Sequence, residues 1–214
     1  MDGTLVDTEP LWIAAERAIV EDAGGTWPDE LALQLVGQPL LVSAQDIITR
    51  SPVTMTPAEL VEELLTRVSA AVRDEGVPWR PGARDLLASA SGAGIPCALV
   101  TMSWRRLVDP IVDQLPDGTF TAIVSGETVE HGKPHPEPYL RAAAALGVAP
   151  SACVAVEDSP TGVTSAVRAG VPTVAVAHMV EIPDLPGAVQ VDSLAQVTLA
   201  DLARLRRAAA ATFD

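Results

Sequence analysis

The sequence is poor in cysteine, in basic residues and in long apolar runs, and each shortage excludes a class of protein. Two cysteines, Cys97 and Cys153, are too few for a disulfide framework or a cysteine metal cluster. Both lie inside apolar runs, so we expect buried thiols in a reducing compartment. No run is long enough to cross a membrane and the N-terminus carries no basic, apolar leader, so we expect a cytoplasmic protein without membrane contact.

Basic residues are also scarce. The 214 residues include 14 Lys and Arg against 28 Asp and Glu, a formal net charge of −14. Such a negative field repels nucleic acid, so we expect no nucleic-acid partner, and any phosphate recognition must be local. The hydrophobic share of 48% is typical of a globular protein with a substantial core, which we expect to be a monomer or a weak homo-oligomer.

The first third of the chain has helical spacing and no strand pattern. The apolar residues of the first predicted helix share one face: Trp12, Ala15, Ile19 and Val20. Gly24-Gly25 ends that helix. A second helix is predicted to begin at Thr56, because Pro57 suits the first helical position and Glu59 completes a capping box. These patterns predict an all-helical domain over residues 9–78.

The remainder alternates short apolar runs with amphipathic segments. The runs predict four strands: Cys97–Thr101, Thr121–Val124, Cys153–Val156 and Thr173–Val176. Near-continuous apolarity suits parallel strands covered on both faces, and helical segments such as Tyr139–Leu146 fit the crossovers between them. We therefore predict an α/β protein whose doubly wound parallel sheet is built from residues 1–8 and 79–214.

Ligands bind beyond the carboxyl ends of the strands in such sheets, and two polar clusters suit that position. Asp2-Gly3-Thr4 near the start is equally compatible with a turn that leads into a capped helix. Thr101-Met102-Ser103 ends an apolar run. A hydroxyl and free N–H groups at a strand-to-helix junction can bind a phosphate, although an ordinary capped helix has the same residue types.

Two further clusters carry charge. Lys133 lies among prolines that stiffen its loop, where a point charge can neutralise phosphate oxygens, although a solvated loop lysine would fit the same pattern. We interpret His131 and His135 beside it as surface turn residues. Glu157 and Asp158 end a buried strand, where adjacent carboxylates repel each other unless a cation lies between them. Mg²⁺ prefers oxygen ligands and is the natural candidate, with helix capping as the alternative.

In this order the four clusters resemble the motifs of the haloacid dehalogenase superfamily of magnesium-dependent phosphatases and phosphomutases. The phrases MDGTLVDTEP, GKPHPEPYL and VEDSPTG resemble the subgroup that contains β-phosphoglucomutase and related sugar-phosphate phosphatases. The predicted helical domain resembles that subgroup's cap, inserted after the first motif. The resemblance spans nearly the whole chain.

The resemblance implies that the phosphoryl group is transferred through an aspartyl-phosphate intermediate. One aspartate attacks phosphorus, and a second acts as general acid and base. Asp2 matches the second aspartate and would also offer its backbone carbonyl to the metal. The nucleophile, and the central strand that carries it in the family, would precede Met1. We therefore expect the natural chain to start upstream, because a missing central strand leaves backbone groups unpaired at about 1–3 kcal/mol each.

The remaining matches imply the rest of the site. Thr101 and Met102 would bind the phosphate, and Lys133 would neutralise it together with the nucleophile. Glu157 and Asp158 would bind Mg²⁺. The substrate is expected to be a small phosphorylated metabolite, most simply a sugar phosphate.

Two alternatives stay open. A phosphomutase would transfer the phosphoryl group to a sugar hydroxyl instead of water. Residues of the helical domain would make this choice; Gln38, Gln45 and Arg50 are candidates, and each is equally compatible with solvated surface. The chain could also be an inactive protein that binds phosphate or a protein partner. A nucleotide-binding oxidoreductase is disfavoured, because Gly92-Ala93-Gly94 precedes an apolar run instead of following one.

Overall fold

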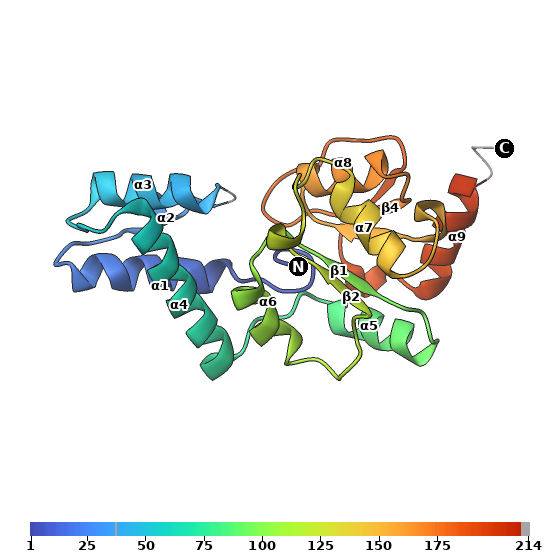
Figure 1. Cartoon of the computed structure of the whole chain (residues 1–214), viewed down its shortest axis with the longest axis horizontal. Helices are drawn as coiled ribbons and strands as arrows, with labels where there is room; N and C mark the ends of the chain where they lie inside the picture. Colours follow the sequence, from blue (N-terminus) through green and yellow to red (C-terminus); the bar gives the residue numbers. More distant parts are fainter. Residues whose placement is uncertain (37, 211–214) are drawn as a thin grey trace. The chain divides into compact units, whose positions relative to one another are not determined.

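The chain divides into two compact units in the computed structural model, which describes residues 1–36 and 38–210. An α/β unit takes Met1–Asp7, Pro78–Arg105 and Leu115–Asp214, and a helical unit takes Thr8–Val77 and Arg106–Gln114. From the sequence, residues 106–114 are expected in the α/β domain. Figure 1 shows the elements of both units.

The helical unit is organised around one long helix. Its elements are α1 (Glu9–Asp22), α2 (Asp29–Ala32), α3 (Leu40–Arg50), α4 (Pro57–Glu75) and most of α6 (Arg105–Val112). α1 and α3 both pack against α4. The buried face of α4 includes the apolar residues Leu60, Leu64, Leu65, Val68 and Val72. None of the described helices is long and apolar enough to cross a membrane.

The predicted start of α4 is confirmed in detail. The Thr56 hydroxyl accepts a hydrogen bond from the Glu59 N–H at 3.3 Å, and the Glu59 carboxylate accepts one from the Thr56 N–H at 2.8 Å. Such a cap contributes about 1 kcal/mol, because it satisfies N–H groups that have no partner inside the helix.

Side-chain contacts to α4 explain why residues 106–114 belong to the helical unit. The Ser69 hydroxyl donates to the Arg106 carbonyl at 3.1 Å, and the Gln114 amide donates to the Val72 carbonyl at 3.2 Å. Leu107, Val108 and Ile111 of this segment are buried. Pro110 lies inside α6, which is only 8 residues long, as expected of a helix shortened by proline.

The α/β unit contains two parallel sheets. β1 (Ala98–Val100) pairs with β2 (Ala122–Val124), and β4 (Thr173–Val176) lies between β3 (Ala155–Glu157) and β5 (Ala188–Val191). The four predicted strands are confirmed. β5 was not predicted, because Val189 and Gln190 at its centre are exposed and lack the apolarity of a buried strand.

Helices cover both faces of the larger sheet, so the predicted α/β fold class is confirmed. They are α5 (Ala83–Gly92), α7 (Glu137–Ala145), α8 (Pro160–Arg168) and α9 (Leu199–Ala210), with short 3₁₀ turns at Gly126–Thr128, Pro150–Ala152 and Leu194–Gln196. Val174 and Val176 pack into a cluster with Ala83 of α5, whereas Ala175 packs with Val163 of α8. Successive side chains of a strand point to opposite faces of the sheet, so Val174 and Val176 face one layer of helices and Ala175 faces the other.

The predicted single sheet is divided in two. In the described part of the chain, β1 pairs only with β2, and β3 pairs only with β4. The expectation that Cys97 and Cys153 are buried is therefore wrong: both are half-exposed. These residues precede β1 and β3, beside strand edges that no described strand covers.

One carboxyl group is buried in the helical unit. Glu16 of α1 is 6% exposed, and its carboxylate accepts a hydrogen bond from the Trp27 indole at 3.1 Å. Burial raises the pKa of Glu16 to about 7, against the lowering effect of the Trp27 hydrogen bond, and the charge of Glu9 raises it further.

We expect this group to make the stability of the protein depend on pH. Because the folded-state pKa is raised, the stabilisation is fully present below about pH 4.5 and is lost as the pH rises through about 7. At about 1.4 kcal/mol per pKa unit, the loss is on the order of 2–3 kcal/mol. Urea unfolding at pH 4.5 and 7.5 measures it.

The Glu16→Gln variant cannot ionise at this position and should lose less stability over this interval. Glu30→Gln, at an exposed position, serves as the control and should behave like the wild type. An equal loss in Glu16→Gln and wild type would contradict the assignment.

Candidate active site

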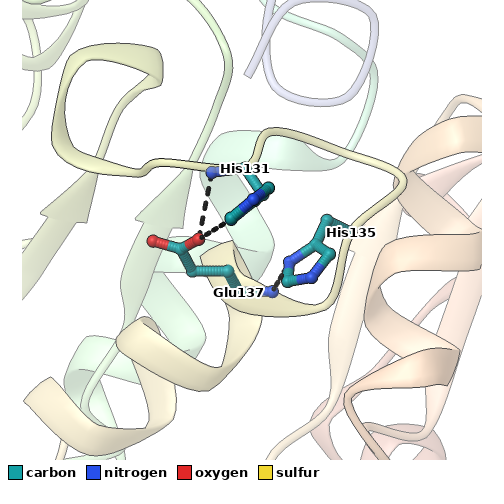
Figure 2. Close-up of side chains that lie close together, drawn as sticks. All are labelled: His131, His135 and Glu137. Carbon is teal, nitrogen blue, oxygen red and sulfur yellow. Dashed lines mark hydrogen bonds and ion pairs between the residues drawn. The ribbon is translucent and has the colours of Figure 1, made fainter.

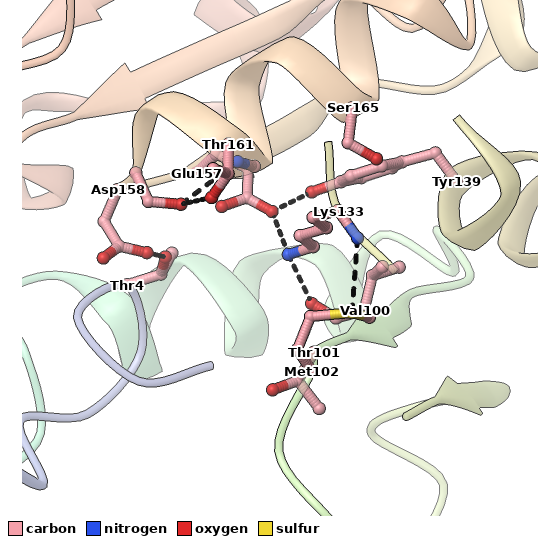
Figure 3. A network of polar contacts seen from close by, with 12 residues as sticks. Thr4, Val100, Thr101, Met102, Lys133, Tyr139, Glu157, Asp158, Thr161 and Ser165 are labelled. Atoms are coloured by element: carbon pink, nitrogen blue, oxygen red, sulfur yellow. Dashed lines mark hydrogen bonds and ion pairs between the residues drawn. The ribbon is translucent and has the colours of Figure 1, made fainter. Parts of the chain in front are cut away.

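The predicted site residues of the α/β unit gather at the carboxyl ends of β1 and β3. Thr101, Met102 and Ser103 follow β1, while Glu157 ends β3 and Asp158 follows it. Figure 3 shows these segments together with Lys133, which comes from the loop before α7, and with Thr4 near the N-terminus.

Lys133 is the only lysine of the chain and lies at the centre of this arrangement. Its ammonium group donates to the Val100 carbonyl at 3.1 Å and forms an ion pair with the Glu157 carboxylate. The two side chains are only 9% and 4% exposed, so the pair is shielded from water. A buried pair of this kind needs further hydrogen bonds to offset the loss of hydration.

Tyr139 supplies such a hydrogen bond. Its hydroxyl donates to the same Glu157 oxygen that binds Lys133, as Figure 3 shows. Burial raises the pKa of Tyr139 well above its ordinary value, and the negative charge of Glu157 adds to the effect. The phenol therefore stays protonated and remains a donor. The role of Tyr139 is not among the sequence predictions, although Tyr139 is the only tyrosine and ends the phrase GKPHPEPY.

Glu137 holds the loop that carries Lys133. Its carboxylate accepts hydrogen bonds from the backbone N–H groups of Glu130 and His131, both at 3.0 Å, and from the Arg141 guanidinium at 2.8 Å. The hydrogen bond to the Glu130 N–H is the main cause that lowers the pKa of Glu137 to about 2. The loop is therefore tied to the first turn of α7.

The same carboxylate belongs to a cluster of three metal-type side chains, shown in Figure 2. Ligand atoms of His131, His135 and Glu137 lie within 4.8 Å of one another. Both Glu137 oxygens already accept hydrogen bonds, one of them from the His131 ring at 3.1 Å. Both histidines are exposed, as predicted for surface turn residues. We interpret the cluster as the support of the loop.

Asp158 lies against the N-terminal segment. The Thr4 hydroxyl donates to Asp158 Oδ1 at 2.6 Å, a contact that the sequence analysis did not predict. Gly3 has φ +73°, and a methyl group on it would lie 2.1 Å from Asp158 Oδ2. Burial raises the pKa of Asp158, while the N-terminal amino group and the Thr4 hydrogen bond work against the rise. The turn of Asp2-Gly3-Thr4 therefore brings backbone and carboxylate together.

Asp2 and Thr101 are linked through Ser103. The Ser103 hydroxyl donates to Asp2 Oδ2 at 2.6 Å, and the Ser103 N–H donates to the Thr101 hydroxyl at 3.1 Å. The sequence alone predicts a helix cap or part of a phosphate site at Ser103, and not this contact with Asp2. Met102 faces the lysine loop, where its sulfur accepts the Lys133 N–H at 3.4 Å.

The donor set suits a hard divalent cation. The side chains of Glu157 and Asp158 offer oxygen atoms, and burial together with the Glu157 charge already disfavours the ionised form of Asp158. A cation beside Asp158 would favour the ionised form of its carboxyl group. The two carboxylates at the end of β3 are therefore ligands of the type that Mg²⁺ prefers.

Comparison with known proteins assigns the family. The model of the haloacid dehalogenase-like hydrolases matches residues 1–176, which include all four polar clusters. The chain belongs to the haloacid dehalogenase-like hydrolase family. The resemblance that the motifs predicted is thereby confirmed.

Among the relatives of this hydrolase are phosphatases of phosphorylated carbohydrates. Hexitol phosphatase A of Escherichia coli is 36% identical over 86% of this chain and 84% of its own length. The phosphorylated carbohydrates phosphatase of Thermotoga maritima is 32% identical over 80% of this chain and 79% of its own. The crystal structure of a putative β-phosphoglucomutase from Thermotoga maritima superposes with a TM-score of 0.79 at 27% identity, covering 97% of this chain and 96% of that one.

We expect Gly3→Ala to destabilise this hydrolase. Alanine at φ +73° costs about 1 kcal/mol, and its methyl group would also displace Asp158 from Thr4. Gly94→Ala is the matched control, since Gly94 has φ +68° with open space around it. Urea unfolding should show a larger loss for Gly3→Ala by about 1 kcal/mol or more. Equal losses would contradict a close contact between Gly3 and Asp158.

We expect Glu137→Gln to loosen the lysine loop. A neutral amide is a weaker acceptor than a carboxylate, so the N–H groups of Glu130 and His131 should exchange faster with deuterium. Because the folded-state pKa of Glu137 is depressed, wild-type protection should hold at pH 4.5 and decline as the pH falls through about 2.

Glu127→Gln is the control for that exchange measurement. Glu127 lies in the 3₁₀ turn Gly126–Thr128 and accepts the Arg105 N–H at 2.8 Å, so removing its charge should leave the amides of Glu130 and His131 unchanged. If Glu137→Gln leaves both amides equally protected, the carboxylate does not hold the loop.

Proposed function

We propose that this protein is a Mg²⁺-dependent phosphatase of a small phosphorylated sugar or sugar alcohol. The observation that carries the proposal is the buried ammonium group of Lys133 between the ends of β1 and β3, with hydroxyls and carboxylates of the family motifs around it. A fixed cation in a water-poor site stabilises negative charge that develops on phosphate oxygens.

Each residue has a role in this proposal. Lys133 neutralises the phosphate, and Thr101 and the backbone of Met102 bind its oxygens. Asp2 gives a proton to the leaving oxygen as the P–O bond breaks and then takes one from the attacking water. The hydrogen bond from Ser103 to Asp2 orients that carboxyl group. The resemblance also implies an attacking aspartate, which none of the four clusters supplies.

Glu157 and Asp158, with the backbone carbonyl of Asp2, would hold Mg²⁺. When bound, the ion would orient the phosphate and neutralise charge. Glu157 also keeps Lys133 in place, since the two form a buried ion pair.

The substrate class rests on the relatives. One is a hexitol phosphatase and another a phosphatase of phosphorylated carbohydrates, so a hexitol phosphate is the first compound to test. The likeness to a putative β-phosphoglucomutase supports the alternative in which a sugar hydroxyl receives the phosphoryl group.

We propose further that the helical unit is the cap that selects the substrate. The candidate residues Gln38, Gln45 and Arg50 each contact other residues of the helical unit. Arg50 donates to the Gln34 side chain at 2.8 Å and pairs with Asp46 at 3.2 Å. Gln38 and Gln45 donate to Gln34 and Thr49, respectively.

The test is hydrolysis of p-nitrophenyl phosphate and a hexitol phosphate in Mg²⁺. The 214-residue chain is compared with one extended upstream by a strand that ends in the expected aspartate. We expect turnover in the extended chain alone, and Asp2→Asn in that chain should lower kcat by about 10²–10⁴-fold. The exposed Asp117→Asn is the control and should leave kcat unchanged.

Two outcomes would contradict this function. Equal hydrolysis by both chains would show that a residue other than the expected aspartate attacks phosphorus. Absence of hydrolysis and of phosphate transfer between hexose phosphates in the extended chain would leave an inactive phosphate-binding protein.

A further inference from the structure

The loop that carries Lys133 also holds two histidines and a glutamate with the residue types of a metal site. Ligand atoms of His131, His135 and Glu137 lie within 4.8 Å of one another, as Figure 2 shows. One of the three precedes Lys133 in the chain and two follow it. The proposed function gives neither histidine a role in catalysis, so the cluster is open to a separate one.

A tight turn places the two imidazole rings side by side. The His135 N–H donates to the Gly132 carbonyl at 3.0 Å, which closes the turn between the histidines. The ring centroids of His131 and His135 lie 4.6 Å apart, with 33° between the ring planes. Both histidines are exposed, so an ion from solution can reach them without unfolding of the loop.

One oxygen of Glu137 completes a set of three ligand atoms. Glu137 Oε2 lies 3.1 Å from His131 Nδ1. Two ligands that are each about 2.0 Å from a tetrahedral ion are about 3.3 Å apart, so this pair already has nearly the required separation. His135 contributes the third atom, and rotation of its exposed ring covers the remaining distance.

The other oxygen of Glu137 fixes the direction of the carboxylate. Oε1 accepts the Glu130 N–H at 3.0 Å and the Arg141 guanidinium at 2.8 Å. Contacts of this kind orient a ligating carboxylate without using the atom that faces the ion. Oε2 accepts the His131 N–H at 3.0 Å, and its second lone pair is directed to other partners. The carboxylate can therefore support the loop and bind an ion at the same time.

Each histidine has a nitrogen lone pair for the ion. The Glu137 N–H donates to His135 Nδ1 at 3.2 Å, so Nδ1 is the unprotonated nitrogen of that ring. A bound ion would replace this long hydrogen bond. At His131 the ion would replace the proton that Nδ1 donates to Glu137 Oε2, and Nε2 would then carry the proton of the ring.

The ligand set favours a transition metal over Mg²⁺. Imidazole nitrogen suits Zn²⁺, Cu²⁺ and Ni²⁺, whereas Mg²⁺ prefers oxygen ligands in octahedral geometry. Two imidazoles and one carboxylate leave the fourth position of a tetrahedral Zn²⁺ ion to water. Glu157 and Asp158 offer oxygen atoms alone, so the two places on the α/β unit would take different ions.

We propose that His131, His135 and Glu137 form a Zn²⁺-binding site on the loop of Lys133, separate from the candidate active site. The ion would join residues on both sides of the lysine and restrain the loop between them. The binding rests on the geometry of the loop and does not depend on the proposed function.

The first test follows Zn²⁺ binding through the histidines of the unmodified chain. Diethyl pyrocarbonate acylates unprotonated imidazoles, and mass spectrometry quantifies each of the three histidines. At about ten times its Kd, Zn²⁺ should slow the modification of His131 and His135 about tenfold, because the free fraction falls by that factor. His178 is the internal reference and should react at an unchanged rate. Mg²⁺ at the same concentration should protect neither ring.

Variants identify the ligands. Competition with a chromophoric chelator measures the Kd of Zn²⁺, with excess Mg²⁺ present to occupy sites made of oxygen alone. His131→Asn and His135→Asn should each raise the Kd about tenfold or more, at least the effect of losing a residue that only orients a ligand. Glu130→Gln removes a neighbouring exposed charge but no ligand and should leave the Kd nearly unchanged. Cys97→Ser combined with Cys153→Ser should also leave it unchanged, which excludes thiolate ligands.

The outcomes decide the proposal. Protection of both rings by Zn²⁺, with weaker binding in both histidine variants, supports the site. Absence of protection at millimolar Zn²⁺ would overturn it, and so would equal protection by Mg²⁺, which indicates a general effect of charge. Equal slowing at His178 would indicate a change of the whole protein instead of binding at the loop. An unchanged Kd in both histidine variants would place the ion elsewhere.

Discussion

The buried ion pair between Lys133 and Glu157 is the interaction on which the α/β unit depends. Lys133 joins the end of β1, through the Val100 carbonyl, to the end of β3, through Glu157. The pair therefore connects two sheets that share no ladder in the described chain. Removing either partner would leave a buried charge, a cost of about 3–5 kcal/mol, and Tyr139 supports the pair with a further hydrogen bond.

Glycines let the carboxylates of the site approach the backbone. A methyl group on Gly162 would lie 2.0 Å from Glu157 Oε2, and one on Gly3 would lie 2.1 Å from Asp158 Oδ2. The segments Asp2-Gly3-Thr4 and Glu157-Asp158 are therefore in direct contact. Positions fixed in this way before a ligand binds need little reorganisation when charge develops.

The division of the sheet leaves two strand edges facing one space. In the described part of the chain, β1 pairs only with β2 and β3 pairs only with β4, and an apolar groove of about 540 Å³ lies between β1 and β3. Lys133 contacts both Val100 and Glu157 at the carboxyl ends of these strands, so one side chain joins the two sheets where the candidate site lies.

The sequence by itself determined the elements and the family, because caps, periodicity and short motifs act over a few neighbouring residues. The capping box at Thr56 and the four strand segments are examples, and Lys133 and Glu157 were placed at a site by their motifs. Contacts between distant segments required the tertiary structure: Ser103 and Asp2 are 101 positions apart, and Thr4 and Asp158 are 154 apart. The half-exposed thiols, the strand β5 and the groove were decided in the same way, since burial depends on which segments pack together and local patterns do not record it.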